Sequence, residues 1–253
     1  TRRSALRWGD VATAVHDVHV IDVVDLTPRM RRVTVEGPSL RGLITTPAQE
    51  VGLALRDAHG SPVRRRYTIR AARPDVGQWD IDVVLHGHGP GALWGESVRV
   101  GDALGFAGPR GAVTLPPAGR HLLFADEAGL PAVAALLEAA PAGQRLTAIV
   151  EIADAAEQQP LPSLAKHDTR WLRRDGLPAG RADLMRCAVE RLDIDPSDTA
   201  ALILAESRVG IAVRDALVEC GVPKAAVQVK GYWNVGRERP RSAAIEALEL
   251  AGL

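Results

Sequence analysis

The sequence predicts a protein of two domains, the first an antiparallel β-barrel and the second an α/β domain built on a parallel sheet. At 253 residues the chain is long enough for two domains of ordinary size. The first half holds short β-branched segments separated by Gly and Pro, a pattern typical of antiparallel barrels. The second half alternates apolar strand-like runs with segments of helical composition, which favours a parallel sheet with helices on both faces.

Six strands are expected in the first half, because six short runs rich in Val, Ile, Leu or aromatic residues lie between turn signals. They cover residues 14–24, 30–35, 51–55, 66–69, 79–85 and 103–107. A short helix is expected to begin near Gly91, and Gly-Pro-Arg-Gly at residues 108–111 is expected to form a tight exit loop. The Pro-Pro-Ala-Gly linker that follows divides the chain into domains of residues 1–117 and 118–253.

The second half is expected to alternate strands with helices. The strands cover residues 121–125, 145–152, 170–172, 200–205 and 227–229, and the helices cover residues 130–140, 182–191 and 209–220. Asp126, Glu127 and Glu206 directly follow strands, where parallel sheets bind their ligands. These carboxylates have two interpretations: charges that a helix dipole stabilises, or ligand contacts.

Composition narrows the possible functions. The formal net charge is zero and aromatic residues make up 4%, which argues against nucleic-acid or anionic-membrane binding. The two cysteines, Cys187 and Cys220, have no zinc-like or iron–sulfur-like spacing, so we expect buried thiols and no metal site. No apolar run approaches the roughly 20 residues of a membrane span, and no signal peptide is visible. We therefore expect a cytoplasmic protein without membrane insertion, in which any redox chemistry requires an organic cofactor.

Two stretches contain the residue types of a site that binds an anion together with a flat ring system. In Arg-x-Tyr-Thr at residues 65–68, Arg65 and Tyr67 share one face of the expected strand, so the Arg can hold an anion while the ring covers a flat ligand. A basic edge strand with a half-buried Tyr is the alternative. After the strand at residues 79–85, glycines at positions 87, 89 and 91 let backbone N–H groups approach an anion beside a helix N-terminus.

With these stretches placed, the sequence resembles the siderophore-interacting protein family, FAD-containing ferric-siderophore reductases of the ferredoxin-reductase superfamily. Stretches in the family's order carry the resemblance at residues 65–68, 82–94, 101–102 with 108–111, 125–132 and 231–237. The last, Gly-Tyr-Trp-Asn-Val-Gly-Arg, is the most specific to this family. The Gly-rich loop departs from the family pattern, because it is one residue shorter and lacks a Ser. The resemblance implies a six-stranded FAD-binding barrel followed by a ferredoxin-reductase-like, NAD(P)-binding-like domain with a C-terminal Tyr-Trp segment.

The resemblance also implies roles for individual residues. Tyr67 packs on the flavin ring and Thr68 approaches its reactive nitrogen, so these two are the expected catalytic residues, and Arg65 meets the FAD pyrophosphate. The implied cofactor-binding set is Arg65, Tyr67, Thr68, Val83, Leu85, His86, Gly89, Gly91, Ala92, Asp126, Tyr232 and Trp233. The cations expected to bind an anionic chelate are Lys230, Arg237 and Arg239, for which a solvated charge cluster is the alternative.

The expected function is reduction of chelated Fe(III) by a monomeric enzyme whose substrate is a ferric siderophore. Electrons would come from NAD(P)H or from reduced ferredoxin as a partner, and the sequence does not choose between these donors or name the siderophore. Two alternatives stay open: a flavin or ferredoxin-type reductase with another acceptor, and a siderophore-binding module without turnover. The family's module also occurs attached to siderophore transporters, and the sequence does not say whether this chain is part of one.

Overall fold

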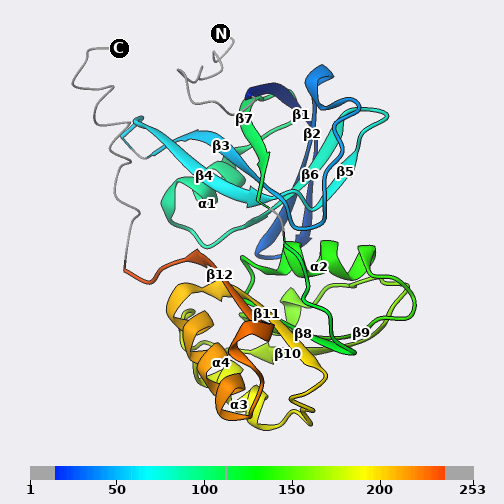
Figure 1. Ribbon diagram of the computed structural model, residues 1–253. Helices are drawn as coiled ribbons and strands as arrows, with labels where there is room; N and C mark the ends of the chain where they lie inside the picture. Colours follow the sequence, from blue (N-terminus) through cyan, green and yellow to red (C-terminus); the bar gives the residue numbers. More distant parts are fainter. Residues whose placement is uncertain (1–14, 58, 112, 237–253) are drawn as a thin grey trace, which may run out of the picture.

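The computed structural model describes residues 15–57, 59–111 and 113–236, and its first part is a seven-stranded antiparallel sheet that curls into a barrel (Figure 1). The strands are β1 (Val15–Thr27), β2 (Met30–Glu36), β3 (Glu50–Arg56), β4 (Pro62–Thr68), β5 (Ala71–Arg73), β6 (Gln78–Val84) and β7 (Ala103–Arg110). Their order in the sheet is β4-β3-β7-β1-β2-β6-β5. The helix α1 (Gly89–Ser97) lies between β6 and β7 in the chain and packs beside β6, β3 and β4.

In β1 and β2 of the barrel, buried residues alternate with more exposed ones. In β1, Val18 and Val20 are buried, whereas Asp17 and His19, which alternate with them, are exposed. The interior is filled by large side chains, among which the rings of Trp79 and Phe106 stack with their centroids 6.2 Å apart.

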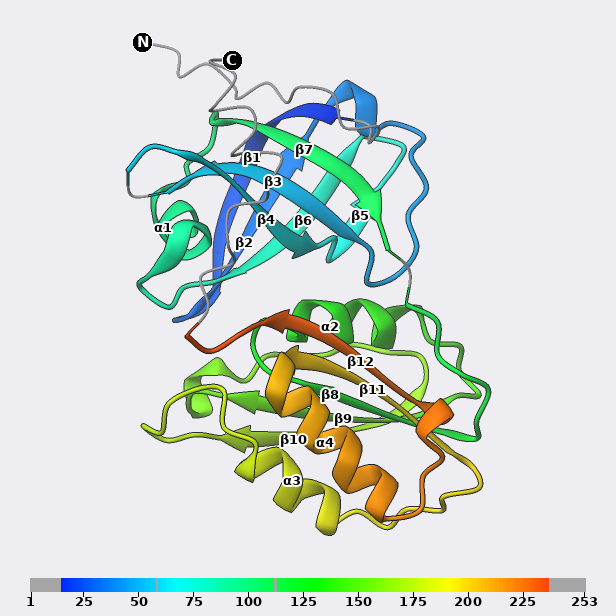
Figure 2. The ribbon, with the colours of Figure 1, turned by 60° about the vertical axis from the view of Figure 1, so that its left-hand side comes forward.

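The second part is a five-stranded parallel sheet with helices on both faces (Figure 2). Its strands are β8 (Arg120–Ala125), β9 (Arg145–Ile152), β10 (Lys166–Arg173), β11 (Thr199–Glu206) and β12 (Val227–Trp233), in the order β10-β9-β8-β11-β12. The helix α2 (Leu130–Ala139) lies on the face toward the barrel, and α3 (Asp183–Glu190) and α4 (Ser207–Glu219) cover the other face. The strand β11 is buried along its whole length, as a central strand of a doubly covered sheet must be.

The two parts share an apolar interface. Met30 and Ala48 of the barrel belong to the same buried cluster as the residues of α2. Polar contacts support it: both guanidinium nitrogens Nη1 and Nη2 of Arg70 donate to the carboxylate of Glu138 on α2, at 2.6 and 2.8 Å. The parts therefore meet along a mixed surface, and the end of β12 lies at its edge.

The fold class predicted from the sequence is confirmed, with corrections of detail. The barrel has seven strands rather than six, because β5 was not expected. The predicted exit loop is wrong: Gly108, Pro109 and Arg110 belong to β7, since Arg110 pairs with Glu50 of β3. The buried thiols are wrong too, because Cys187 and Cys220 are both exposed.

Two further points concern boundaries and membranes. The predicted domain boundary at residues 117 and 118 falls between β7 and β8 and stays a prediction. Within the residues that the structure describes, no helix is long and apolar enough to cross a membrane.

Candidate cofactor and substrate site

The end of β4 brings the two expected catalytic side chains to the boundary between the two parts of the structure. Tyr67 is half-buried, its ring lies 5.9 Å from that of Trp94 on α1, and burial raises the pKa of its phenol. Its hydroxyl lies so close to Gly91 that any side chain there would collide with it. Thr68 is buried, and its Oγ1 lies 3.4 Å from the hydroxyl of Tyr232 on β12. The two catalytic candidates therefore contact different elements, Tyr67 the helix and Thr68 the last strand.

The N-terminus of α1 has no side-chain cap. Its N-cap residue, His88, makes no side-chain cap hydrogen bond within the described chain, and the first turn holds no acidic residue. The preceding loop is shaped by Gly87 and Gly89, whose φ angles of 78° and 77° favour glycine. Because the first N–H groups of a helix have no intrahelical partner, this end can accept an anion.

The expected contact residues near α1 divide into two groups. Val83 and Ala92 are fully buried, and Leu85 packs beneath Gly95 of α1, so these three support the helix through packing. His86, by contrast, is exposed, and partial desolvation together with the neighbouring His88 lowers the pKa of its imidazole. The residues that support this loop are therefore buried, whereas His86 in the loop is exposed.

Adjacent residues of β12 point in opposite directions, as they do in any strand. Tyr232 points to the barrel and meets Thr68, whereas the indole Nε1 of Trp233 donates to Oδ2 of Asp126 at 2.7 Å. Asp126 is buried beside the start of α2, and burial raises its pKa to about 6. Tyr232 therefore joins the site at β4, and Trp233 with Asp126 belongs to a second region on the parallel sheet.

The expected chelate-binding cations are only partly within the described chain. Lys230 makes an ion pair with Glu50 of β3, with 3.0 Å between Nζ and Oε1, and its Nζ lies 5.5 Å from the centre of the Tyr232 ring. Arg237 and Arg239 lie outside the described residues. Arg65 is half-buried on β4, and its guanidinium Nη1 donates to the carbonyl of Arg64 at 3.0 Å.

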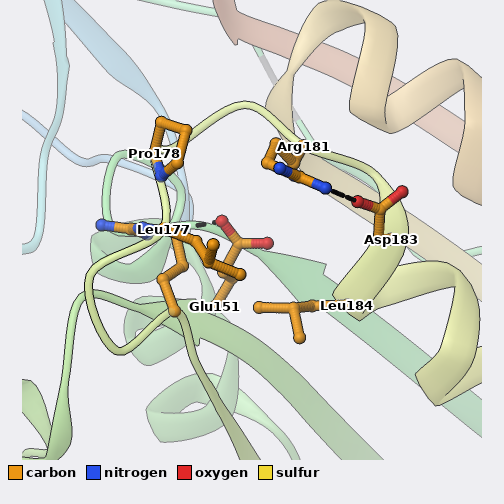
Figure 3. Close-up of a pocket in the computed structure, with 7 residues that line it drawn as sticks. Glu151, Leu177, Pro178, Arg181, Asp183 and Leu184 are labelled. Atoms are coloured by element: carbon orange, nitrogen blue, oxygen red, sulfur yellow. Dashed lines mark hydrogen bonds and ion pairs between the residues drawn. The ribbon is translucent and has the colours of Figure 1, made fainter.

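Sequence reasoning missed several residues at these sites. Glu50 and Trp94 contact the predicted residues, and nothing in their local sequence signals it. A small pocket also opens beside the ends of β9 and β10 (Figure 3), where Glu151 lies under the loop that carries Leu177 and Pro178. The pocket is lined by Glu151, Arg174, Leu177, Pro178, Arg181, Asp183 and Leu184.

The residues around β4, α1 and β12 fit an FAD. The uncapped first turn of α1 offers donors for a diphosphate, and the rings of Tyr67 and Tyr232 offer apolar faces for a flat ring system. Because Gly91 has no side chain, the hydroxyl of Tyr67 can lie against the start of α1. Donors, aromatic faces and a buried hydroxyl are thus gathered within one site.

Comparisons with known proteins agree with this arrangement. The family model for siderophore-interacting proteins matches residues 118–236, and that for the siderophore-interacting FAD-binding domain matches residues 45–113. The ferric vibriobactin reductase ViuB of Vibrio cholerae is 29% identical over 201 residues, which cover 78% of this chain and 73% of ViuB. The mycobactin import ATP-binding/permease protein IrtA of Mycobacterium tuberculosis is 30% identical over 239 residues, 88% of this chain but 26% of IrtA.

Solved structures show the same fold. A siderophore utilization protein from T. fusca superposes with a TM-score of 0.82 and 31% identity, covering 91% of this chain and 97% of that one. The ferredoxin reductase of carbazole 1,9a-dioxygenase superposes with a TM-score of 0.72 at 17% identity, covering 88% of this chain and 70% of that one, a likeness of fold alone. The two parts of the chain therefore have the ferredoxin-reductase-like arrangement.

Proposed function

The chain belongs to the siderophore-interacting protein family, and we propose that it is an FAD-dependent ferric-siderophore reductase that releases iron as Fe(II). The observation that carries the proposal is that the end of β4 places Tyr67 against the uncapped start of α1 and Thr68 against Tyr232 of β12. The relative ViuB, a ferric vibriobactin reductase by name, supports a chelated Fe(III) as the acceptor. The proposed electron donors are NAD(P)H or reduced ferredoxin.

Each residue has a proposed task at this site. Arg65 and the first turn of α1 hold the diphosphate of FAD, and the rings of Tyr67 and Tyr232 shield its flat ring from water. The hydroxyl of Thr68 donates a hydrogen bond at the edge of that ring. When bound, FAD supplies the redox chemistry that protein side chains cannot.

No protein ligand to iron is required by this proposal. The chelate keeps the metal while one electron is transferred, and siderophores hold Fe(II) far less tightly than Fe(III). The chain's own task toward the chelate is to admit it near Tyr232, where Lys230 supplies positive charge that Glu50 partly neutralises. Arg237 and Arg239 are proposed to add to that charge.

The test begins with FAD loading of the purified chain, followed by removal of free cofactor and a visible spectrum. The loaded protein is then reduced anaerobically and mixed with ferric chelates, and released Fe(II) is trapped with a chromogenic chelator. The proposal expects bound flavin and faster release from siderophores than from a simple ferric chelate. A colourless protein that still binds siderophore indicates a binding module, and a flavoprotein without chelate preference indicates a reductase with another acceptor.

Thr68→Val sharpens this test, because it keeps the shape of the side chain and removes the hydroxyl. Loss of one hydrogen bond worth about 1–1.5 kcal/mol lowers the rate of Fe(II) release about tenfold, with FAD still bound. The matched control is Thr169→Val on β10, whose buried hydroxyl has no partner among the described residues. Equal rates for the two variants contradict the role of Thr68.

A further inference from the structure

The parallel sheet has a fixed place where a dinucleotide is expected to bind. Its strand order reverses between β8 and β11, and ligands of open α/β sheets bind outside the carboxyl ends of the strands at such a switch point. Both strands lead directly into helices, α2 and α4, whose N-termini point toward this place (Figure 2). A nicotinamide dinucleotide would set its pyrophosphate against one of these helix ends.

The first of these ends already holds a carboxylate. Oδ1 of Asp126 accepts the N–H groups of Ala128 and Gly129 at 2.9 and 3.2 Å, and Asp126 is buried. The turn also touches the neighbouring strand, because a Cβ atom on Gly129 would collide with the backbone carbonyl of Leu204 in β11. In the turn before α2, Asp126 therefore occupies two N–H groups, and the turn lies tight against β11.

At the second end, a carboxylate caps the helix itself. Glu206 is only 1% exposed, and its Oε2 accepts the N–H groups of Arg208 and Val209 at 2.6 and 2.9 Å. Its other oxygen, Oε1, accepts the N–H of Val235 at 3.2 Å. The two carboxylate-bearing residues are in contact, since Oδ2 of Asp126 accepts the backbone N–H of Glu206 at 2.9 Å.

Trp233 lies over these two residues. Its indole donates to Asp126, and its carbonyl accepts the hydroxyl of Ser207 at 3.1 Å, which holds the end of β12 against the start of α4. The ring reaches the connection between β10 and α3, because a Cβ atom on Gly180 would lie 3.1 Å from it. The indole thus lies between Asp126 and the connection that precedes α3.

The rest of this edge is acidic as well. Beside the pocket of Figure 3, the guanidinium of Arg174 is shared by Glu127 and Glu151, at 2.6 and 3.3 Å. Two carboxylates on one cation leave no spare positive charge there for a phosphate. A diphosphate entering this edge would therefore meet the carboxylates of Asp126, Glu127, Glu151 and Glu206.

Building on the proposed function, we propose that Asp126 and Glu206 exclude nicotinamide dinucleotides from the switch point, so that electrons reach this chain from a one-electron carrier protein. The two carboxylates occupy the donors that a pyrophosphate needs, and their charge repels it. The stoichiometry balances without a hydride: the carrier loses one electron, and one Fe(III) gains it and becomes Fe(II). Asp126 and Glu206 determine which electron donor is used, and they do not belong to the site at β4.

The first test measures binding without any redox step. NADP⁺ and NADH are titrated calorimetrically into the full chain, for which we expect dissociation constants weaker than about 1 mM. The Asp126→Ser/Glu206→Ser double variant removes both charges, and Ser keeps the capping ability of the position. It is expected to bind NADP⁺ at least about tenfold more tightly than the wild type, with folding checked by its thermal transition.

Two outcomes of this titration would contradict the proposal. Micromolar binding of NADP⁺ or NADH by the wild type overturns it. A folded double variant that binds no better overturns the assignment to these two carboxylates, and the single Glu206→Ser variant repeats this test if the double variant does not fold. Because the titration needs no flavin, its result stands apart from FAD loading, whose failure would overturn only the proposed function.

The second test compares electron donors anaerobically. Wild-type protein loaded with FAD is mixed with equal concentrations of reduced ferredoxin or NADPH, and flavin absorbance is followed. We expect bleaching by ferredoxin at least about a hundredfold faster than by NADPH. Saturable bleaching by NADPH at a comparable rate overturns the proposal.

Discussion

Glu151 is a buried carboxyl group whose ionisation lowers the stability of the folded protein. The side chain is 2% exposed, Arg174 holds its Oε1 at 3.3 Å, and its Oε2 has no hydrogen-bond partner among the described residues. Burial, partly opposed by the Arg174 charge, raises its pKa from 4.5 to about 7. The folded protein therefore binds this proton more tightly than the unfolded chain does.

This shift predicts a pH-dependent stability difference. Because the folded-state pKa is the higher one, the stabilisation is present below about pH 4.5 and is lost as pH rises to about 7. Glu151→Gln removes the titration, so its free energy of unfolding relative to wild type should rise across that window by about 3 kcal/mol and then level off. Denaturant unfolding from pH 4 to pH 8 measures this difference.

The control for this prediction is Glu190→Gln on α3, an exposed glutamate, for which no change of the difference with pH is expected. A flat difference for Glu151→Gln would show that the buried carboxylate relaxes into water when it ionises.

For single residues, the sequence could predict which residues lie near the site but not the directions in which their side chains point. Tyr232 and Trp233 were expected to flank one cleft together, from their place in a family-specific stretch. They lie on opposite faces because they are neighbours in β12, a strand that was expected to be shorter than it is. The structure supports the helix-terminal interpretation for Glu206, which caps α4, whereas Asp126 accepts N–H groups of the turn before α2.

At the scale of elements, the packing of α1 on β4 depends on Gly91. The hydroxyl of Tyr67 occupies the space that a side chain would need, so Gly91→Ala must displace the tyrosine or the helix. We expect FAD affinity to fall on the order of tenfold, since both elements belong to the proposed cofactor site. A fluorescence titration with FAD measures the change.

Gly143→Ala is the matched control, because nothing lies within 4 Å of the position where its Cβ would be. Unchanged FAD affinity in Gly91→Ala would place the diphosphate away from this helix.

Most elements were predictable because their composition and their packing agree. The short strand β5 was not, since its Ala-Ala-Arg sequence has no strand signal and its pairing with β6 is what orders it. The end of β7 has the composition of a turn, yet the partner strand β3 keeps it extended. Tertiary pairing overrode local preference in both places, and a single sequence does not record such pairing.

At the scale of the whole molecule, a buried carboxylate adds to the contacts between the two parts of the structure. Glu157, in a short 3₁₀ turn after β9, is 3% exposed. Its Oε2 accepts the hydroxyl of Thr27 at 2.6 Å, and Oε1 accepts the backbone N–H of Arg29 at 3.1 Å. Thr27 ends β1 and Arg29 lies in the turn before β2, so this contact helps to hold the barrel on the parallel sheet.

Removal of that carboxylate should weaken the attachment of the barrel to the parallel sheet. Glu157→Ala leaves a buried hydroxyl and a backbone N–H without their acceptor, which costs about 2–3 kcal/mol of unfolding free energy. Glu157→Gln keeps one acceptor oxygen and should lose about half as much. A double-mutant cycle with Thr27→Val isolates the contact itself, and denaturant unfolding should give a coupling energy of about 1–2 kcal/mol. Additive effects would mean that the apolar interface around Met30 and α2 holds the two parts together without it.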